Sequence, residues 1–238
     1  MTRAVQLAIA AVIGGAAAVE RKGALQLMLS RPLALGPLLG AALGDVRGGL
    51  TIGVPLELLF LGAVNLGATL PDNETIAASC AVAAAVLAGQ DTHIGVDETT
   101  ATLAIALFLP TAVLGRRLER LTEGINRRLA ARARATIAAQ PARAIRLHLG
   151  GLLAPFLAGA AYTGIAAALA PFLAALRRGL DHHLVQGLEI GWIFFLAVCC
   201  ASAVRAIRDA RAPSFAAMAS GAIALVTLAV KILHWRSP

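Results

Sequence analysis

Charged side chains are scarce in this chain: Asp, Glu, Lys and Arg make up 14% of its 238 residues, against about 25% in a typical soluble domain. Aromatic residues are scarce too, at 4%, and none lies among the clustered arginines of residues 116–146. Proteins that bind single-stranded nucleic acids interleave aromatic and basic side chains. The composition therefore argues against a soluble domain and, despite a net charge of +8, against nucleic-acid binding.

Cysteine is also rare, and the three that occur, Cys80, Cys199 and Cys200, do not have the spacing of a metal site or a disulfide framework. All three lie in apolar segments, so we expect them to act as small buried hydrophobes. The sequence lacks a Walker loop, GxGxxG, HExxH and GxSxG. The pair His182-His183 has no cysteine or carboxylate cluster around it except Asp181. We therefore expect no cofactor, no metal and no enzymatic activity.

Apolar residues, in contrast, are abundant: they make up 58% of the chain, and its mean hydropathy is +0.77. The apolar segments cover roughly residues 4–19, 32–44, 48–71, 75–89, 101–115, 149–176, 184–204 and 215–233. A membrane-spanning helix needs about 20 mostly apolar residues. The sequence thus predicts an all-α polytopic membrane protein. Residues 1–18 have features of a cleaved signal peptide, but the membrane sequence that follows favours a retained first helix.

Several apolar runs are too short to span a bilayer alone, because 32–44, 75–89 and 101–115 hold only 13 to 15 residues each. Prolines and glycines are dense across 32–71, with prolines at 32, 37, 55 and 71. Such breakers predict re-entrant hairpins or discontinuous helices, although the glycines also suit close helix packing. We expect a membrane region at 1–115 and C-terminal membrane helices at 149–238.

The intervening segment, 116–148, is basic: nine of the 21 Lys and Arg residues fall between Arg116 and Arg146. Leucine and isoleucine recur within it at spacings of three and four, at 118, 121, 125 and 129. The pattern predicts an amphipathic helix along the cytoplasmic surface, with docking of a partner as the alternative. The acidic loop 90–100 is predicted to face the other side, although Arg177 and Arg178 count against this topology.

Two polar residues, Glu57 and Asn65, lie inside the apolar run 53–73, where a polar side chain is unfavourable unless it has a partner or a function. A charge at the bilayer centre costs about 2.5 to 3.5 kcal/mol, so Glu57 is a functional candidate. The alternative to a functional role for Glu57 is a structural ion pair with Arg31 or Arg47. In an unbroken helix Asn65 would lie about 80° round from Glu57, and its amide both donates and accepts. The alternative to a ligand-binding role for Asn65 is a structural hydrogen bond between helices.

Asp72 follows Pro71 at the end of the same run. It either caps a helix that begins near Thr75 or faces a cavity. A carboxylate and an amide held in an apolar scaffold are typical of a pocket for neighbouring sugar hydroxyls. The sequence therefore predicts a polar ligand pocket that uses Glu57, Asn65 and Asp72.

The run 31–72 resembles the IIC subunits of the mannose/fructose/sorbose family of the bacterial phosphotransferase system. The resemblance rests on an ordered set of residues: Arg31-Pro32, Leu-Gly-x-x-x-Gly-Asp at Leu39 to Asp45, Gly49, Leu56-Glu57, Gly62, Asn65-x-Gly67-Ala68 and Pro71-Asp72. A weaker likeness continues through Gly89 to Gly95 and Pro110.

The resemblance implies a function. A IIC subunit binds and moves a sugar together with a IID membrane subunit, in an oligomeric complex of the bacterial inner membrane. Cytoplasmic IIA and IIB proteins carry the phosphoryl group, so the IIC subunit is not itself the enzyme. Residues Glu57, Asn65 and Asp72 would lie near the sugar, supported by Arg31 and Asp45. Residues 25–30 lack the acids that family members carry before Arg31, which keeps a non-transporting scaffold or regulatory protein as the alternative.

Overall fold

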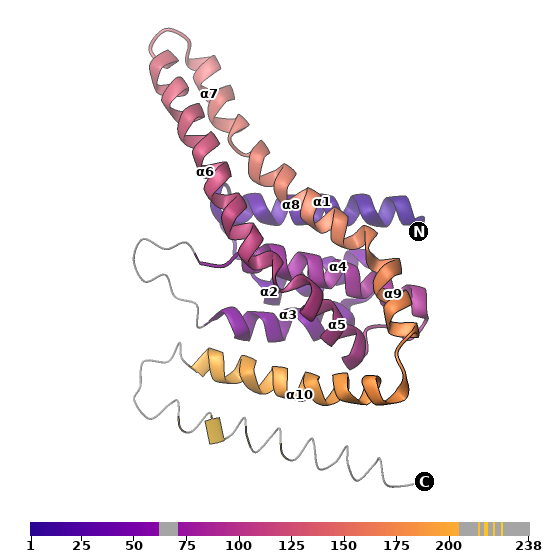
Figure 1. The fold of residues 1–238 in the computed structure, drawn as a ribbon. Coiled ribbons are helices and arrows are strands. Elements are labelled where there is room, and N and C mark those ends of the chain that lie inside the picture. Colours follow the sequence, from indigo (N-terminus) through magenta and orange to yellow (C-terminus); the bar gives the residue numbers. More distant parts are fainter. Residues whose placement is uncertain (62–70, 205–213, 215–216, 219–220, 222–224, 226–238) are drawn as a thin grey trace.

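The computed structural model describes residues 1–61 and 71–204, and residues 214, 217, 218, 221 and 225 individually. These described residues form helices and no strand, as the sequence predicts (Figure 1). The helices are α1 (Arg3–Lys22), α2 (Pro32–Leu43), α3 (Val46–Leu61), α4 (Glu74–Thr92), α5 (Glu98–Phe108), α6 (Thr111–Thr136), α7 (Pro141–Gly150), α8 (Leu153–Ala168), α9 (Ala170–Arg178) and α10 (His182–Val204).

Five helical segments within the described residues are long and apolar enough to cross a membrane: Arg3–Lys22, Glu74–Thr92, Glu98–Thr136, Pro141–Arg178 and His182–Val204. The third and fourth of these segments are interrupted: Glu98–Thr136 at Pro110 between α5 and α6, and Pro141–Arg178 at Leu169 between α8 and α9. The prediction of spanning and discontinuous helices is therefore confirmed. Most of residues 1–18, the alternative signal peptide, lies in α1, which packs against α8 and α4.

Helix α4 forms the centre of the bundle, where it contacts helices α1, α2, α3, α5, α6, α8 and α9. Residues 75–89 of α4 are all buried, and many are alanines that let the neighbouring helices approach closely. The run 75–89 was predicted to be too short to span, and this is wrong because the helix continues through Thr92. Its last turn tolerates polar side chains because Gln90 donates to the Leu43 carbonyl at 2.6 Å and accepts from Gln6 at 2.7 Å.

Helices α2 and α3, with 12 and 16 residues, form the hairpin that the prolines and glycines of this region predict. The chain reverses at Gly44, whose φ of +97° is a left-handed conformation that favours glycine. Asp45 follows and accepts the Gly48 N–H at 2.8 Å, which stabilises the first turn of α3. The two helices of this α2–α3 hairpin touch through glycines, including Gly36 and Gly49.

The N-terminus of α4 is capped by Asn73, so of the two alternatives for Asp72 the one that makes it the cap is wrong. The Asn73 side chain accepts the Ile76 N–H at 3.0 Å, and its amide donates to Glu119 of α6 at 3.1 Å. Asp72 instead faces Arg116, with 3.3 Å between the charged atoms. An asparagine holds both roles because it carries an acceptor for the helix and a donor for the neighbouring carboxylate.

Replacing Asn73 with alanine is expected to destabilise the protein by about 1 kcal/mol for the lost cap, and by more because Glu119 loses a donor. Asp72→Ala is the matched control. It removes an ion pair whose side chains are 39% and 33% exposed, and such pairs contribute about 0–1 kcal/mol. Denaturation midpoints of the purified proteins check the ranking, and a larger loss in Asp72→Ala would contradict the assignment of the cap.

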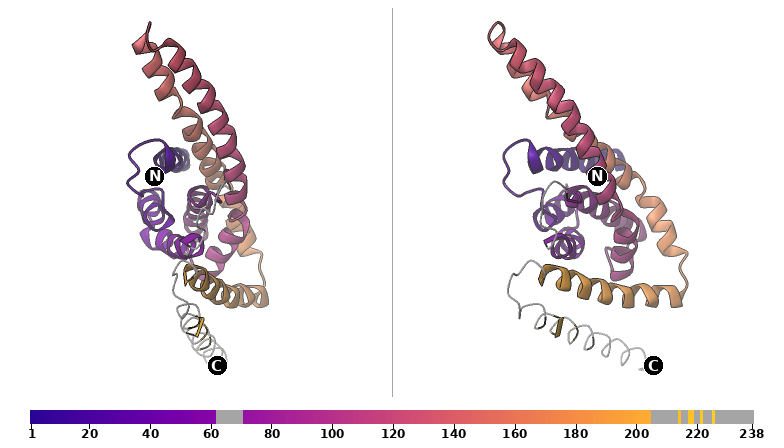
Figure 2. Two further views of the ribbon diagram at one scale, coloured as in Figure 1. Left: turned by 90° about the vertical axis from the view of Figure 1, so that its left-hand side faces the viewer. Right: turned by 60° about the vertical axis from the view of Figure 1, so that its left-hand side comes forward.

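The basic segment 116–148 lies within two helices, α6 and α7, rather than one (Figure 1). The predicted boundary at 115/116 falls inside α6, which begins at Thr111, and Pro141 opens α7. Together α6 and α7 form a hairpin that projects from the remaining helices in all three views (Figures 1 and 2). Leu121 and Ile125 on α6 are exposed. Surface binding and partner docking both stay predictions for this segment.

The opposite end of the bundle carries the acidic loop 90–100 together with Arg177 and Arg178. Arg177 donates to the Asp97 carboxylate at 2.8 Å, and Arg178 donates to the Asp91 carbonyl at 3.2 Å. Asp91 also pairs with Arg3 at 3.2 Å. Arg177 and Arg178 therefore both bond to the acidic loop, at the end of the bundle where α1 begins (Figure 1), which explains how they coexist with it.

Replacing Asp97 with asparagine is expected to remove a pH-dependent contribution to stability. Burial raises the pKa of Asp97, but hydrogen bonds from Arg177 and Thr100 hold it below its ordinary value of 3.8. A carboxyl with a lowered folded-state pKa stabilises the fold above pH 3.8, and this contribution is lost as the pH falls through the folded-state pKa. Asparagine still accepts the Thr100 N–H and keeps the cap.

Denaturation midpoints at pH 6, 4.5 and 3 provide the measurement. At pH 6 the free energy of unfolding of the wild-type protein is expected to exceed that of Asp97→Asn by about 1 kcal/mol. This difference is expected to shrink below pH 3.8. A difference that stays constant with pH would show that the charge of Asp97 contributes nothing.

Candidate functional site

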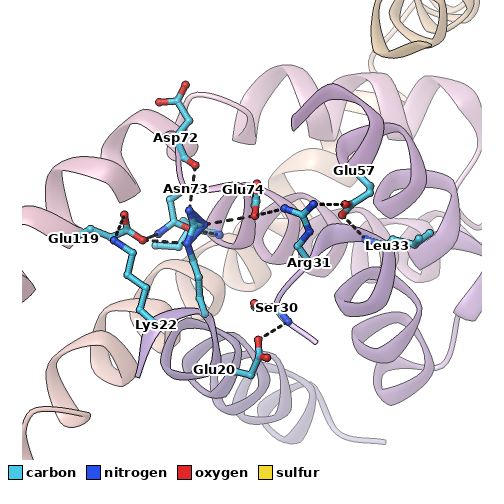
Figure 3. Close-up of polar contacts among 12 residues, drawn as sticks. Glu20, Lys22, Ser30, Arg31, Leu33, Glu57, Asp72, Asn73, Glu74 and Glu119 are labelled. Atoms are coloured by element: carbon cyan, nitrogen blue, oxygen red, sulfur yellow. Dashed lines mark hydrogen bonds and ion pairs between the residues drawn. The ribbon is translucent and has the colours of Figure 1, made fainter. Parts of the chain in front are cut away.

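A chain of ion pairs joins five helices at the end of the bundle where the α2–α3 hairpin opens (Figure 3). Arg31 occupies the N-cap position of α2. Its guanidinium lies 3.1 Å from a carboxylate oxygen of Glu57 on α3 and 3.1 Å from one of Glu74 on α4. The Leu33 N–H also donates to Glu57, at 3.4 Å. Arg31 therefore ties both helices of the hairpin to α4.

The same chain continues to α1 and α6. Arg21 lies 3.2 Å from Glu119, and Lys22 bridges Glu119 at 3.3 Å and Glu123 at 3.1 Å. The side chains of Arg21 and Glu119 are only 12% and 11% exposed. Partly buried charges of this kind need partners, because removing one partner leaves the other desolvated and uncompensated.

The structure brings some of the predicted site residues together and separates others. Arg31 and Glu57 form a pair, which was the structural alternative for Glu57, and Asp72 lies near the same chain, where its carbonyl accepts from Arg21 at 3.5 Å. Asp45 does not join them, because it sits at the turn between α2 and α3. Asn65 lies outside the described residues.

Sequence reasoning missed the other members of this chain of ion pairs, Arg21, Lys22, Glu74, Glu119 and Glu123, and the neighbouring Glu20, which accepts the Ser30 N–H. Glu74 lies two residues after the motif run, and Glu119 is one of two acids within a basic segment. Charges at the ends of apolar helices are the available signal, since each needs a partner at the membrane boundary. Their pairing across α1, α4 and α6 becomes visible only in the fold.

A cavity of about 430 Å³ opens beside Arg31 and Glu74. Its wall comes from the end of α1, the connection from α1 to α2, and Pro71. Among the described residues no group of three or more His, Cys, Asp and Glu side chains is placed to hold a metal ion. The cavity lining offers guanidinium donors and carboxylate acceptors, which together suit a neutral ligand with several hydroxyl groups.

Known proteins that resemble this chain agree on a family. A sequence model of the family described as the PTS system sorbose-specific IIC component matches residues 2–234. Over 70 residues the chain is 37% identical to "Putative N-acetylgalactosamine permease IIC component 2" of Escherichia coli (strain K12), a match that covers 29% of this chain and 53% of that protein. The chain thus spans about half the length of that curated relative.

Two solved structures share the fold. One is titled "Structure of membrane protein"; it has a TM-score of 0.65 and 21% identity, and the match covers 97% of this chain and 94% of that chain. The other is the mannose transporter ManYZ in complex with microcin E492, with a TM-score of 0.54, 20% identity and coverage of 100% and 97%. The family match extends over nearly the whole sequence. The chain therefore belongs to the sorbose-specific IIC component family of the phosphotransferase system.

Proposed function

We propose that the chain is the sugar-binding and translocation subunit of a phosphoenolpyruvate-dependent phosphotransferase system. It moves a hexose-type sugar inward, and a IIB partner phosphorylates the sugar as it emerges. The observation that carries the proposal is the family match over residues 2–234. The placement of Arg31 and Glu57, 3.1 Å apart at the open end of the α2–α3 hairpin, supports it, because an ionisable pair at such a position is a candidate site in a membrane protein.

Glu57, Asn65 and Asp72 are the residues we propose to contact the sugar. Glu57 has carboxylate oxygens at the open end of the α2–α3 hairpin, and Asp72 lies just before α4. Carboxylates accept hydrogen bonds from sugar hydroxyls, and an amide such as that of Asn65 both donates and accepts. Arg31 holds Glu57 in place, and Asp45 supports the site from the turn of the hairpin.

The proposed partners follow from the same function. A IID membrane subunit completes the sugar pathway in an oligomeric complex of the bacterial inner membrane, and cytoplasmic IIA and IIB proteins supply the phosphoryl group. The solved structure of ManYZ, which its title calls a mannose transporter, has the same fold over the full length of this chain.

Phosphoenolpyruvate-dependent uptake tests the proposal. Membrane vesicles that hold this chain with its IIA, IIB and IID partners are supplied with a panel of sugars that includes sorbose, mannose, fructose and N-acetylgalactosamine. Accumulation of one phosphosugar inside the vesicles is the expected result. A stable complex that accumulates none of them would overturn the proposal.

A non-transporting IIC-like scaffold or regulatory protein is the second candidate. The observation that favours it is that Glu57 and Arg31 are already engaged with each other and with Glu74, which is the arrangement expected of a purely structural network. If the protein is such a scaffold or regulator, the complex assembles in the vesicles without accumulating sugar. Substitution of Glu57 then changes the stability of the protein and nothing else.

A further inference from the structure

We propose that Glu20 and Arg21 bind the sugar directly, in the cavity of about 430 Å³ between the end of α1, the connection to α2 and the start of α4. The inference rests on the proposed function and adds to it two residues outside the motif run. The cavity lies within the size range of small-molecule sites, about 300–1,000 Å³. Glu20, Arg21, Arg31 and Glu74 all line it, so it adjoins the Arg31–Glu57 pair.

Glu20 provides an acceptor that the fold leaves unused. Its residue is only 8% exposed, and one carboxylate oxygen, Oε2, accepts the Ser30 N–H at 2.8 Å. The Ser30 hydroxyl and the backbone N–H groups of Met28 and Leu29 also point toward this carboxylate. Yet the other oxygen, Oε1, is buried and reaches no donor among the described residues with hydrogen-bond geometry. A buried carboxylate oxygen without a partner is costly, so its presence at a cavity wall indicates a ligand.

Arg21 provides a matching donor in the same cavity. Its Nε lies 3.2 Å from Glu119, and its Nη2 donates to the Asp72 carbonyl at 3.5 Å. The remaining nitrogen, Nη1, is buried and makes no hydrogen bond with the described residues. A carboxylate oxygen of Glu74 lies 3.9 Å from it, which is close enough for an ion pair but too far for a hydrogen bond.

The charges around the cavity select for a neutral ligand. Arg31 is balanced by Glu57 and Glu74, and Lys22 is balanced by Glu119 and Glu123. A phosphate or carboxylate ligand would meet the Glu20 carboxylate, and an ammonium ligand would meet the guanidinium of Arg21. A hydroxyl group suits both, because it donates to an oxygen such as Glu20 Oε1 and accepts from a nitrogen such as Arg21 Nη1. Two neighbouring hydroxyls of a sugar ring satisfy both atoms together.

Equilibrium binding of radiolabelled sorbose, mannose, fructose and N-acetylgalactosamine to the full chain, assembled with its IID partner in lipid nanodiscs, tests the inference. Glu20→Gln keeps an acceptor for the Ser30 N–H but places an NH2 group where Oε1 was. Arg21→Lys keeps the charge beside Glu119 and removes the Nη1 donor. Each is expected to raise the Kd of the bound sugar at least tenfold. The matched controls, Asp91→Asn and Arg3→Lys, lie outside the cavity lining and are expected to stay within twofold of wild type.

A third variant tests the inference even if the first two variants fail to fold. Met28 lines the cavity, and its side chain is 73% exposed at the surface, so Met28→Trp fills the space without touching an ion pair. It is also expected to raise the Kd at least tenfold. Wild-type affinity in Met28→Trp and in every folded variant at positions 20 and 21, with binding still lost in Glu57→Gln, would overturn this inference alone. Absence of binding by the wild-type complex would overturn the proposed function as well.

Discussion

Replacing Glu57 with glutamine is expected to reduce the initial rate of phosphosugar accumulation by roughly 10- to 100-fold, while the protein still inserts and folds. Hydrogen bonds to charged groups contribute about 1.5–3 kcal/mol, and each 1.4 kcal/mol is about a factor of ten in binding. Glutamine has the same shape and still accepts the Leu33 N–H, which lies 3.4 Å from the carboxylate. Uptake per inserted protein, measured in vesicles with the partner subunits, provides the test.

Glu74→Gln is the matched control, because it separates contact with the sugar from support of Arg31. Glu57 and Glu74 both lie 3.1 Å from Arg31, and their side chains are 13% and 14% exposed. If Glu57 acted only by holding Arg31, the two variants would lose uptake equally. A much larger loss in Glu57→Gln is expected, because of these two carboxylates only Glu57 is proposed to hydrogen-bond to the sugar, whereas Glu74 pairs with Arg31 at the cavity wall. Equal effects, or full uptake by both, would contradict the site assignment.

The α2–α3 hairpin was predictable because its determinants are local. Prolines at 32, 37 and 55 and a high density of glycine mark a broken helical segment in any context. The length of α4 was not predictable, because Gln90 and Asp91 resemble a polar loop. They stay in or next to the last helical turn because Gln90 hydrogen-bonds to Leu43 and Gln6, and Asp91 pairs with Arg3. Those partners lie more than 40 residues away along the chain.

The candidate site, too, was predictable where its determinants are local and not where they depend on contacts between distant residues. The pairing of Glu57 with Arg31 was foreseen as an alternative, since a carboxylate in an apolar run requires a partner. Asp45 was grouped with them because it belongs to the same motif run. The 12 residues of α2 rise about 18 Å at 1.5 Å per residue, so the turn carries Asp45 to the far end of the hairpin. Glu20, Arg21 and Glu119 reach the site only through packing of α1 and α6.

Replacing Gly36 with alanine is expected to disrupt the α2–α3 hairpin and abolish uptake. A Cβ at this position would lie 2.5 Å from the Gly49 carbonyl oxygen and 3.0 Å from the Gly53 Cα. Both are backbone atoms of α3, so no side chain can rotate away to make room. Overpacking in a close-packed interior costs about 1–3 kcal/mol, occasionally more, and relief here requires that the two helices move apart.

Gly191→Ala is the control, because a Cβ at this position of α10 meets no atom of the described residues within 4 Å. There the substitution is expected to be neutral or to stabilise by up to about 1 kcal/mol, since alanine favours helix over glycine. Denaturation midpoints in nanodiscs and vesicle uptake are compared for both variants. Separation of α2 from α3 also moves Arg31 at the start of α2 away from Glu57 on α3, so uptake is expected to fall with stability. A Gly36→Ala protein with wild-type stability and uptake would mean that the glycine contact does not hold the hairpin closed.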